Sequence, residues 1–325
     1  MPAGVRERRA PALSYALAVR LGLYLTSAVP EGDLRDVVEL ARAAEDAGFD
    51  DLCIGDHVAM GDSRPDWAGP RFPHRPAERF PEPLTLLAAV ATVTARVRLV
   101  TCILIAPLRP AALLAKTAAT VHALSEGRLV LGVSVSWQQP EYEALGVPFE
   151  ERGRRLDDLV GACRALWGTS PASFSSPTVS FTDMHCEPRP ASVDDIPIWF
   201  GGHCTPHLVR RVADWGQGFL PHVDAATSWQ EVGEQTNRIS DAMRAAGRDP
   251  SALEVGVRFP PFGKSFPQGL EEDLSAMVAA GVTQLYVPIV APRTLADARS
   301  AVGELARDFE PYRAVPAGPT LPSER

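Results

Sequence analysis

The sequence predicts an α/β protein of the (β/α)8 TIM-barrel class with insertions. Three observations favour this fold. Short apolar runs alternate with segments of helical periodicity, the alternation recurs as eight strand–helix pairs, and 325 residues suffice for a barrel of roughly 250. A doubly wound open sheet is the alternative, but no GxGxxG motif follows the first expected strand. We therefore expect parallel strands joined by crossover helices.

Helix boundaries in the first half of the chain carry recognisable signals. Asp33 is a suitable N-cap for the first helix, and Gly48 follows its end. Pro110 occupies a plausible first position of a later helix. Strands are expected at residues 20–26, 51–54, 97–105 and 128–135, and helices at 33–47, 82–94, 110–124 and 152–167.

The second half repeats this alternation after a segment rich in Ser, Pro and Thr at 169–195, which we interpret as an insertion with one hairpin. Strands are expected at residues 196–200, 218–221, 253–259 and 284–287, and helices at 205–215, 228–246, 270–280 and 295–309. Residues 19–312 would then form the barrel domain. It would lie between a flexible N-terminal tail, residues 1–18, and a Pro-rich C-terminal tail, residues 313–325.

Composition excludes several classes of function. The net charge of -8 opposes a nucleic-acid partner, because phosphate backbones require a basic surface. The five cysteines are widely spaced and form no CxxC motif, so we expect reduced thiols in a cytoplasmic protein and neither a zinc ribbon nor a disulfide framework. No apolar run is long enough to span a bilayer. A small-molecule substrate is the expected partner.

The active site of such a barrel lies at the carboxyl ends of its strands, so the residues just after each expected strand are the candidates for chemistry. Asp56 and His57 follow the second strand. His57 can donate or accept a proton near neutral pH, which makes it the candidate catalytic residue. The alternative is a surface histidine hydrogen-bonded to Asp56 or to the backbone.

A second candidate feature is the glycine pair Gly201-Gly202, which precedes an expected helix and could bind an anion. An ordinary βα turn is the alternative. His203 and His207 have the spacing of a metal pair, but Pro206 lies between them and no third ligand is near, so no metal site is expected.

Aromatic residues in the long polar loop at 56–81 are the candidate substrate contacts. Trp67 and Phe72 would line the pocket, and the alternative is that they and Phe80 merely pin the loop to the barrel.

Several ordered motifs resemble the bacterial luciferase-like superfamily. The segment 98–137 contains a strand, a proline-led helix with the core A-K-T-A-A-T, the turn L-S-E-G-R and a further strand. The run E-Y-E-A-L-G at 141–146 and the run P-I-W-F-G-G at 197–202 resemble the next two blocks of that superfamily. The resemblance covers roughly residues 20–310 and is closest to the branch that uses coenzyme F420, a 5-deazaflavin.

The resemblance implies a cofactor-binding set at the strand ends. It consists of Asp56 and His57 after the second strand, Thr101, Cys102 and Ile103 in a bulge behind the ring, and Gly201, Gly202 and His203 in a phosphate-binding turn. It also implies a non-proline cis peptide between Cys102 and Ile103.

One segment departs from the family pattern. Where the family reads G-V-G-x-G, residues 132–136 read G-V-S-V-S, so Ser134 and Ser136 would face the cofactor in place of glycines. Trp137 stands where sugar-phosphate dehydrogenases of this branch carry an acid, so oxidation of glucose 6-phosphate is not expected.

The resemblance implies hydride transfer between coenzyme F420 and a small organic substrate, in a homodimer as in relatives. Three alternatives stay open: an FMN-dependent monooxygenase, a barrel that has lost cofactor binding and acts as a binding protein, and a metal-dependent hydrolase.

Overall fold

The computed structural model describes residues 19–25, 33–61, 80–260, 270–289, 292 and 294–313. Its barrel strands are β1 (Arg20–Tyr24), β2 (Asp51–Ile54), β3 (Arg98–Thr101), β5 (Leu129–Ser134), β8 (Ile198–Gly202), β9 (Gly218–Pro221), β10 (Glu254–Arg258) and β11 (Gln284–Pro288). These strands pair in the order β3-β2-β1-β11-β10-β9-β8-β5, all in parallel, and β5 pairs again with β3. The ring is therefore closed, which confirms the (β/α)8 barrel and excludes the open sheet.

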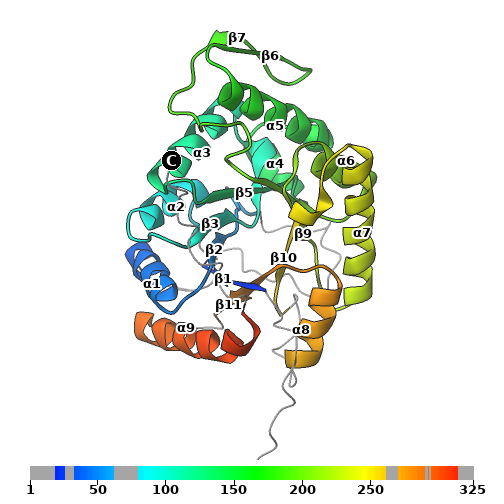
Figure 1. Ribbon diagram of the computed structural model, residues 1–325. Helices are drawn as coiled ribbons and strands as arrows, with labels where there is room; N and C mark the ends of the chain where they lie inside the picture. Colours follow the sequence, from blue (N-terminus) through cyan, green and yellow to red (C-terminus); the bar gives the residue numbers. More distant parts are fainter. Residues whose placement is uncertain are drawn as a thin grey trace, which may run out of the picture.

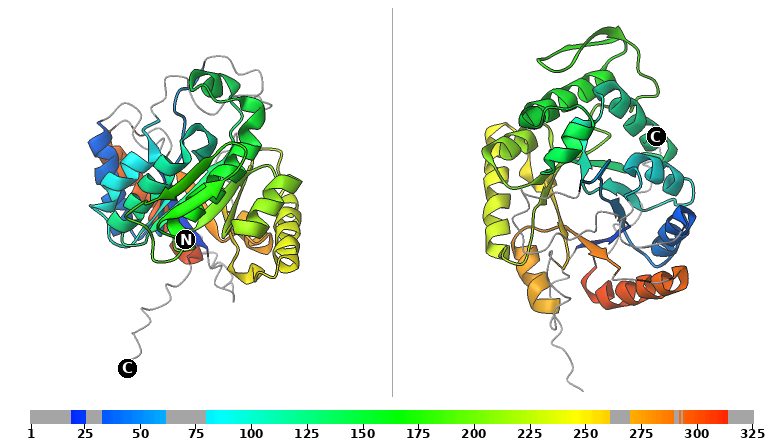
Figure 2. Two further views of the ribbon diagram at one scale, coloured as in Figure 1. Left: turned by 90° about the horizontal axis from the view of Figure 1, so that it is seen from above. Right: turned by 180° about the vertical axis from the view of Figure 1, so that it is seen from behind.

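Helices surround this ring on its outer side, as Figure 1 shows along the barrel and Figure 2 from behind. They are α1 (Leu34–Asp46), α2 (Pro83–Ala91), α3 (Ala111–Leu124), α4 (Gln139–Ala144), α5 (Arg152–Gly168), α6 (Pro206–Trp215), α7 (Trp229–Ala245), α8 (Leu270–Ala279) and α9 (Leu295–Phe309). The expected helices recur with small shifts at their ends. The short helix α4 was not expected, because six residues are too few to display a helical period.

The strand expected at 97–105 is not continuous, which corrects the sequence interpretation. β3 ends at Thr101, and a two-residue strand, β4 (Leu104–Ile105), continues along β5 after a break at Cys102 and Ile103. An uninterrupted apolar run carries no signal for such a break, because every residue in it is compatible with a buried strand.

The segment 169–195 contains an antiparallel hairpin of β6 (Ala172–Ser175) and β7 (Ser180–Met184), as expected for this insertion. Figure 1 shows the hairpin at the outer side of α5. Phe174 packs against this helix where Gly161 leaves room for it: a Cβ at Gly161 would lie 2.9 Å from the ring.

Bulky side chains fill the barrel interior. Tyr286 and Trp199 are completely buried there, in contact with residues of the other strands. Glycines make the space for these rings, since a Cβ at Gly22 would lie 2.4 Å from Tyr286 and one at Gly218 would lie 2.5 Å from Trp199. The barrel is thus a packed core, and chemistry is confined to its open end.

Charged side chains close the opposite, amino-terminal end of the barrel. Asp51, at the start of β2, is fully buried and receives hydrogen bonds from Arg20 and Arg98. Arg98 also reaches Glu254 on β10, at 2.8 Å, and stacks over the Trp199 ring, 5.3 Å from its centre. This network connects β1, β2, β3 and β10 across the floor of the barrel.

Some expectations fall outside the described residues. They are the N-terminal tail at 1–18, residues 314–325 of the C-terminal tail expected at 313–325, and the candidate substrate contacts Trp67 and Phe72.

Candidate functional site

The predicted cofactor residues all lie at one end of the barrel, because the carboxyl ends of its parallel strands point the same way. Asp56 and His57 follow β2, the break at 102–103 follows β3, residues 134–137 end β5 and leave it, and residues 201–203 end β8 and leave it. These residues differ in the hydrogen bonds and packing contacts that their side chains make.

Both carboxylate oxygens of Asp56 accept hydrogen bonds from other residues of the chain. Oδ2 accepts a hydrogen bond from the Ile105 backbone N at 2.8 Å, and both oxygens accept from the Arg109 guanidinium, at 2.6 and 3.1 Å. Arg109 in turn reaches Glu82, ahead of α2. Asp56 therefore fixes the position of β4 and of the break before it, and any effect on a bound cofactor would pass through that backbone.

The break between β3 and β4 contains a cis peptide bond between Cys102 and Ile103, which confirms the expectation. Thr101 Oγ1 donates to the Gly132 carbonyl at 2.8 Å, and the Cys102 N donates to the Ile54 carbonyl at 2.7 Å. A Cβ on Gly201 would lie 2.6 Å from the Ile103 side chain. Ile103 and Cys102 are half-buried and form an apolar surface at the mouth of the barrel.

The two serines at the positions where the resemblance predicts glycines, Ser134 and Ser136, differ in conformation. Ser134 is a buried strand residue at the end of β5, and its hydroxyl is the nearest atom, at 3.6 Å, to the point where a Gly202 Cβ would lie. Ser136 has a φ of 58°, in the left-handed region that favours glycine. The backbone at 136 thus keeps the shape that a glycine would support, although the sequence has serine.

His57 is held by Glu141, a residue that the sequence analysis quoted only as part of a motif. His57 Nδ1 lies 3.0 Å from Glu141 Oε2. Glu141 Oε1 accepts hydrogen bonds from the backbone N of Val58 and of Ala59, the latter at 3.2 Å. The Glu141 carboxylate is completely buried and the His57 side chain is 10% exposed. The alternative considered from the sequence, a surface histidine hydrogen-bonded to Asp56, does not describe this arrangement.

Aromatic rings flank the imidazole. Phe80 and Trp137 meet it edge-on, with ring centres at 4.9 and 6.5 Å and interplanar angles of 80° and 76°. Trp137 follows β5 and Phe80 precedes α2, so rings from two separate segments limit how the imidazole can turn.

Below the mouth, next to Cys102, lie the Cys53 thiol and Arg258, two residues that sequence reasoning did not select as site residues. Burial, and then a hydrogen bond with Cys102, raise the pKa of Cys53 well above its usual value, which disfavours the thiolate form. Arg258, at the end of β10, lies near Tyr24 and both thiols, and burial lowers its pKa. The alternation of side chains along β2 and β10 was the sequence signal that could have identified these residues. Alternation shows which residues face the barrel interior only once the register of the strands is known.

Two further histidines, His203 and His222, lie just after the ends of β8 and β9. The His203 ring, ahead of α6, packs against His222 and not against His207 within that helix, and the His203 and His222 ring centres are 4.8 Å apart. Burial and the neighbouring His203 lower the pKa of His222. With Asp224 and Glu231 they line a cavity of about 230 Å³. Within the described ranges no three His, Cys, Asp or Glu side chains are grouped to hold a metal ion.

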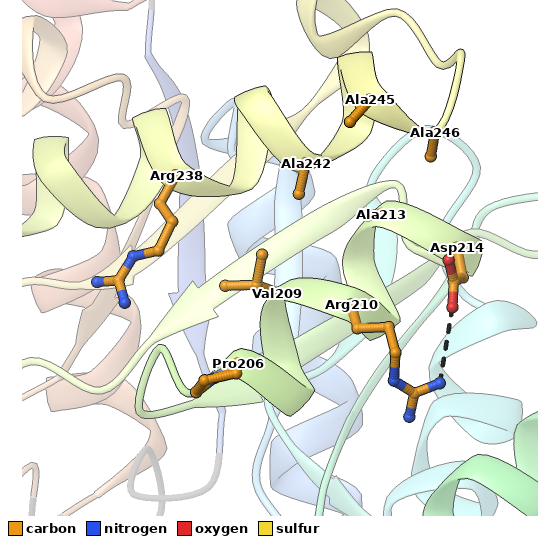
Figure 3. A pocket seen from close by; sticks show the side chains of 9 residues that line it. All are labelled: Pro206, Val209, Arg210, Ala213, Asp214, Arg238, Ala242, Ala245 and Ala246. Atoms are coloured by element: carbon orange, nitrogen blue, oxygen red, sulfur yellow. Dashed lines mark ion pairs between the residues drawn. The ribbon is translucent and has the colours of Figure 1, made fainter.

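The larger hollow of about 500 Å³ lies elsewhere, between α6 and α7 on the outer side of the barrel (Figure 3). Its walls are Val209 and several alanines, with an ion pair of 3.6 Å between Arg210 and Asp214 at one edge. None of the predicted site residues lines it, so we do not assign it to the chemistry. In the described part of the chain, no helix has the length and apolar character needed to cross a membrane.

Comparison with known proteins places these features in a family. The family model described as luciferase-like monooxygenase matches residues 13–320. An uncharacterized protein of Mycobacterium tuberculosis is 34% identical over 197 residues, 57% of this chain and 66% of that protein. The pyrimidine monooxygenase RutA of Escherichia coli is 33% identical over 173 residues, 52% of this chain and 44% of RutA.

Solved structures with the same fold include a monooxygenase and an F420-dependent dehydrogenase. The monooxygenase RslO1 from Streptomyces bottropensis superposes with a TM-score of 0.71 at 18% identity, covering 90% of this chain and 99% of that one. An F420-dependent secondary alcohol dehydrogenase, in complex with an F420–acetone adduct, has a TM-score of 0.71 at 16% identity, covering 91% and 99%. At these identities the similarity establishes the fold alone.

Proposed function

Because this chain belongs to the luciferase-like monooxygenase family, we propose that it is an oxidoreductase that binds a deazaflavin of the coenzyme F420 type at the mouth of its barrel. Its substrate would be a small organic molecule. The motif resemblance to the F420-using branch favours the deazaflavin, and the fold is also that of an F420-dependent alcohol dehydrogenase. When bound, the deazaflavin supplies two-electron hydride chemistry.

The observation that carries this proposal is the position of His57. Its imidazole lies at the open end of the barrel, held by a buried carboxylate and flanked by Phe80 and Trp137. Hydride chemistry at a carbon generally requires a proton to move at a neighbouring heteroatom. A fixed imidazole, which can both donate and accept a proton, suits that task.

The other residues at the mouth suit a flat ring with an anionic tail. Cys102 and Ile103 provide an apolar surface at the mouth, and Trp137 provides an aromatic side wall. Gly202, with a φ of 129°, lets the backbone at the end of β8 turn where no side chain would be accommodated without strain. We propose that this turn, with Gly201, His203 and Ser134, holds the phosphate end, and that Thr101 and Ser136 shape the backbone beside the ring.

We propose Trp67 and Phe72, in the sequence segment 56–81, as substrate contacts. We also propose that the protein acts as a cytoplasmic homodimer. A flavin-dependent monooxygenase is the second candidate. It is supported by the similarity to a pyrimidine monooxygenase and to the monooxygenase RslO1.

Side-by-side titration of the purified protein with coenzyme F420 and with FMN, followed by fluorescence, tests the cofactor. We expect tighter binding of F420. Equal or tighter binding of FMN would replace the proposal with the second candidate, and binding of neither would favour a barrel that has lost its cofactor.

A matched pair of glycine variants tests the location. Gly202→Ala should weaken cofactor binding, whereas Gly146→Ala should not, although both positions have positive φ and both variants incur backbone strain. Gly146 has no atoms near its Cβ position and follows α4 outside the mouth. Equal effects of the two variants would place the cofactor elsewhere.

A turnover assay tests His57. Once a substrate is found, His57→Ala should lower kcat by about 10²–10⁴-fold, the usual loss on removing general acid–base help, while cofactor affinity changes much less. Near wild-type turnover would remove His57 from the mechanism.

A further inference from the structure

The hydrogen bonds of Glu141 determine which nitrogen of His57 carries a proton. Oε1 of Glu141 faces two backbone N–H groups, those of Val58 and Ala59, and a backbone N–H can only donate. These two donors stabilise the ionised carboxylate inside a fully buried environment. An ionised carboxylate has only acceptor capacity left for its second oxygen, Oε2.

The partner of Oε2 must therefore be a donor. That partner is His57 Nδ1, at 3.0 Å. In neutral imidazole one ring nitrogen is a donor and the other an acceptor, so a proton on Nδ1 leaves Nε2 with the free lone pair.

The surroundings also oppose a flip of the ring. Exchanging Nδ1 for a carbon would leave a buried carboxylate oxygen without its hydrogen bond, and Phe80 and Trp137 stand edge-on against the imidazole. Contacts from the segments after β2, after β5 and before α2 thus favour the same orientation of the His57 ring.

We infer that Glu141 is a positioning residue that locks neutral His57 in the Nδ1–H tautomer and presents Nε2 as a proton acceptor. The lock itself depends only on the geometry. Its consequence for catalysis rests on the proposed function: Nε2 of His57 would act first as a base, taking a proton from the substrate heteroatom whose neighbouring carbon gives up a hydride to the bound deazaflavin.

The chain offers a matched pair of variants for this inference. In Glu141→Gln the amide oxygen can still accept from the Val58 and Ala59 N–H groups, so the NH2 group is turned toward His57 and donates to Nδ1. The neutral ring must then carry its proton on Nε2. Glu143→Gln is the control, because Glu143 is an exposed residue of the same helix that bonds to Gln139.

Long-range ¹⁵N–¹H spectra of histidine-labelled protein without cofactor, recorded above the imidazole titration range, report each tautomer directly. The sequence has seven histidines, and comparison with His57→Gln identifies the signal of His57. We expect the Nδ1–H pattern in the wild type and in Glu143→Gln, and the Nε2–H pattern in Glu141→Gln.

A wild-type spectrum with the Nε2–H pattern would overturn the inference, even if Glu141→Gln fails to fold. A folded Glu141→Gln that keeps the Nδ1–H pattern would overturn it as well. Failure of the proposed function is distinguishable, since the protein would then bind neither cofactor, or His57→Ala would retain turnover, while the tautomer stayed as inferred.

Discussion

At the scale of single residues, Ser136 holds a backbone conformation that glycine adopts more easily than any residue with a side chain. Its φ of 58° costs a non-glycine residue about 1 kcal/mol or more, a cost that the surroundings of β5 must offset. A serine therefore occupies a backbone conformation that would suit the glycine of the family pattern that the sequence resembles.

We predict that Ser136→Gly raises the free energy of unfolding by up to about 1 kcal/mol, because the strain disappears. Ser134→Gly is the control: Ser134 lies within β5 at ordinary φ, so glycine there should lower stability by about 0.5–1 kcal/mol. Urea unfolding of both variants measures the difference. Stabilisation by Ser134→Gly, or a loss with Ser136→Gly, would contradict this reading.

The same substitution bears on ligand binding. If the mouth holds a cofactor, Ser136→Gly alone or with Ser134→Gly should strengthen its binding, since a glycine permits closer approach. Fluorescence titration checks this. Unchanged or weaker binding by the double variant would mean that the serines make contacts of their own.

At the scale of elements, Glu45 joins the end of α1 to the start of β3. Its side chain is 8% exposed and accepts hydrogen bonds from three successive backbone N–H groups, those of Ala95, Arg96 and Val97, at 2.7–3.1 Å. Burial alone would raise the pKa of Glu45, but these backbone donors outweigh it and lower the pKa below 4.5.

The lowered pKa sets the direction of a pH effect. Because the unfolded chain binds a proton at Glu45 more readily than the folded chain, the ionised carboxylate stabilises the fold above pH 4.5, and this contribution is lost as the pH falls through the folded-state pKa. We predict that Glu45→Gln lowers the free energy of unfolding at pH 7 by roughly 1–3 kcal/mol, with a smaller difference below pH 4.5.

Urea unfolding at pH 7 and at acidic pH measures this effect. Glu39→Gln is the control on the same helix, since Glu39 is exposed and pairs with Arg299 at 3.3 Å, and it should change stability by less than about 0.5 kcal/mol. A Glu45→Gln loss that is the same at every pH would refute the assignment of the effect to ionisation.

At the scale of the whole molecule, the closed floor of the barrel depends on one buried charge. Asp51 accepts hydrogen bonds from Arg98 at 2.8 and 3.0 Å and from Arg20 at 3.0 Å. Burial would lower the pKa of Arg98, but the hydrogen bonds and charge of Asp51 raise it, so the guanidinium stays charged. Removing the Asp51 charge would leave the largely buried Arg98 guanidinium with Glu254 as its remaining carboxylate partner.

We predict that Asp51→Asn lowers the free energy of unfolding by about 3–5 kcal/mol, the range for breaking a buried ion pair from one side. Asp241→Asn, which breaks an exposed pair with Arg244 of 2.6 Å, should change it by less than about 0.5 kcal/mol. Thermal and urea unfolding of the two variants check this. Comparable losses would mean that the floor network contributes little to barrel closure.

The sequence by itself determined the class of the fold. Alternating apolar runs and helical periods suffice for eight strand–helix pairs, since each element must bury one face, and short crossover connections then make the strands parallel. The ordered motifs between residues 98 and 202 also indicated the family, and the position of His57 shortly after a strand placed it at the carboxyl end of the barrel strands.

Only the tertiary structure decided which side chains meet at that end. Glu141 lies 84 residues from His57, and His203 packs against His222 and not against His207. Asp56, adjacent to His57 in sequence, turns away to Arg109 and Ile105. The physical reason is that barrel closure brings the ends of distant strands together, whereas the direction of each side chain depends on register and on breaks such as that at Cys102 and Ile103, which local patterns do not encode.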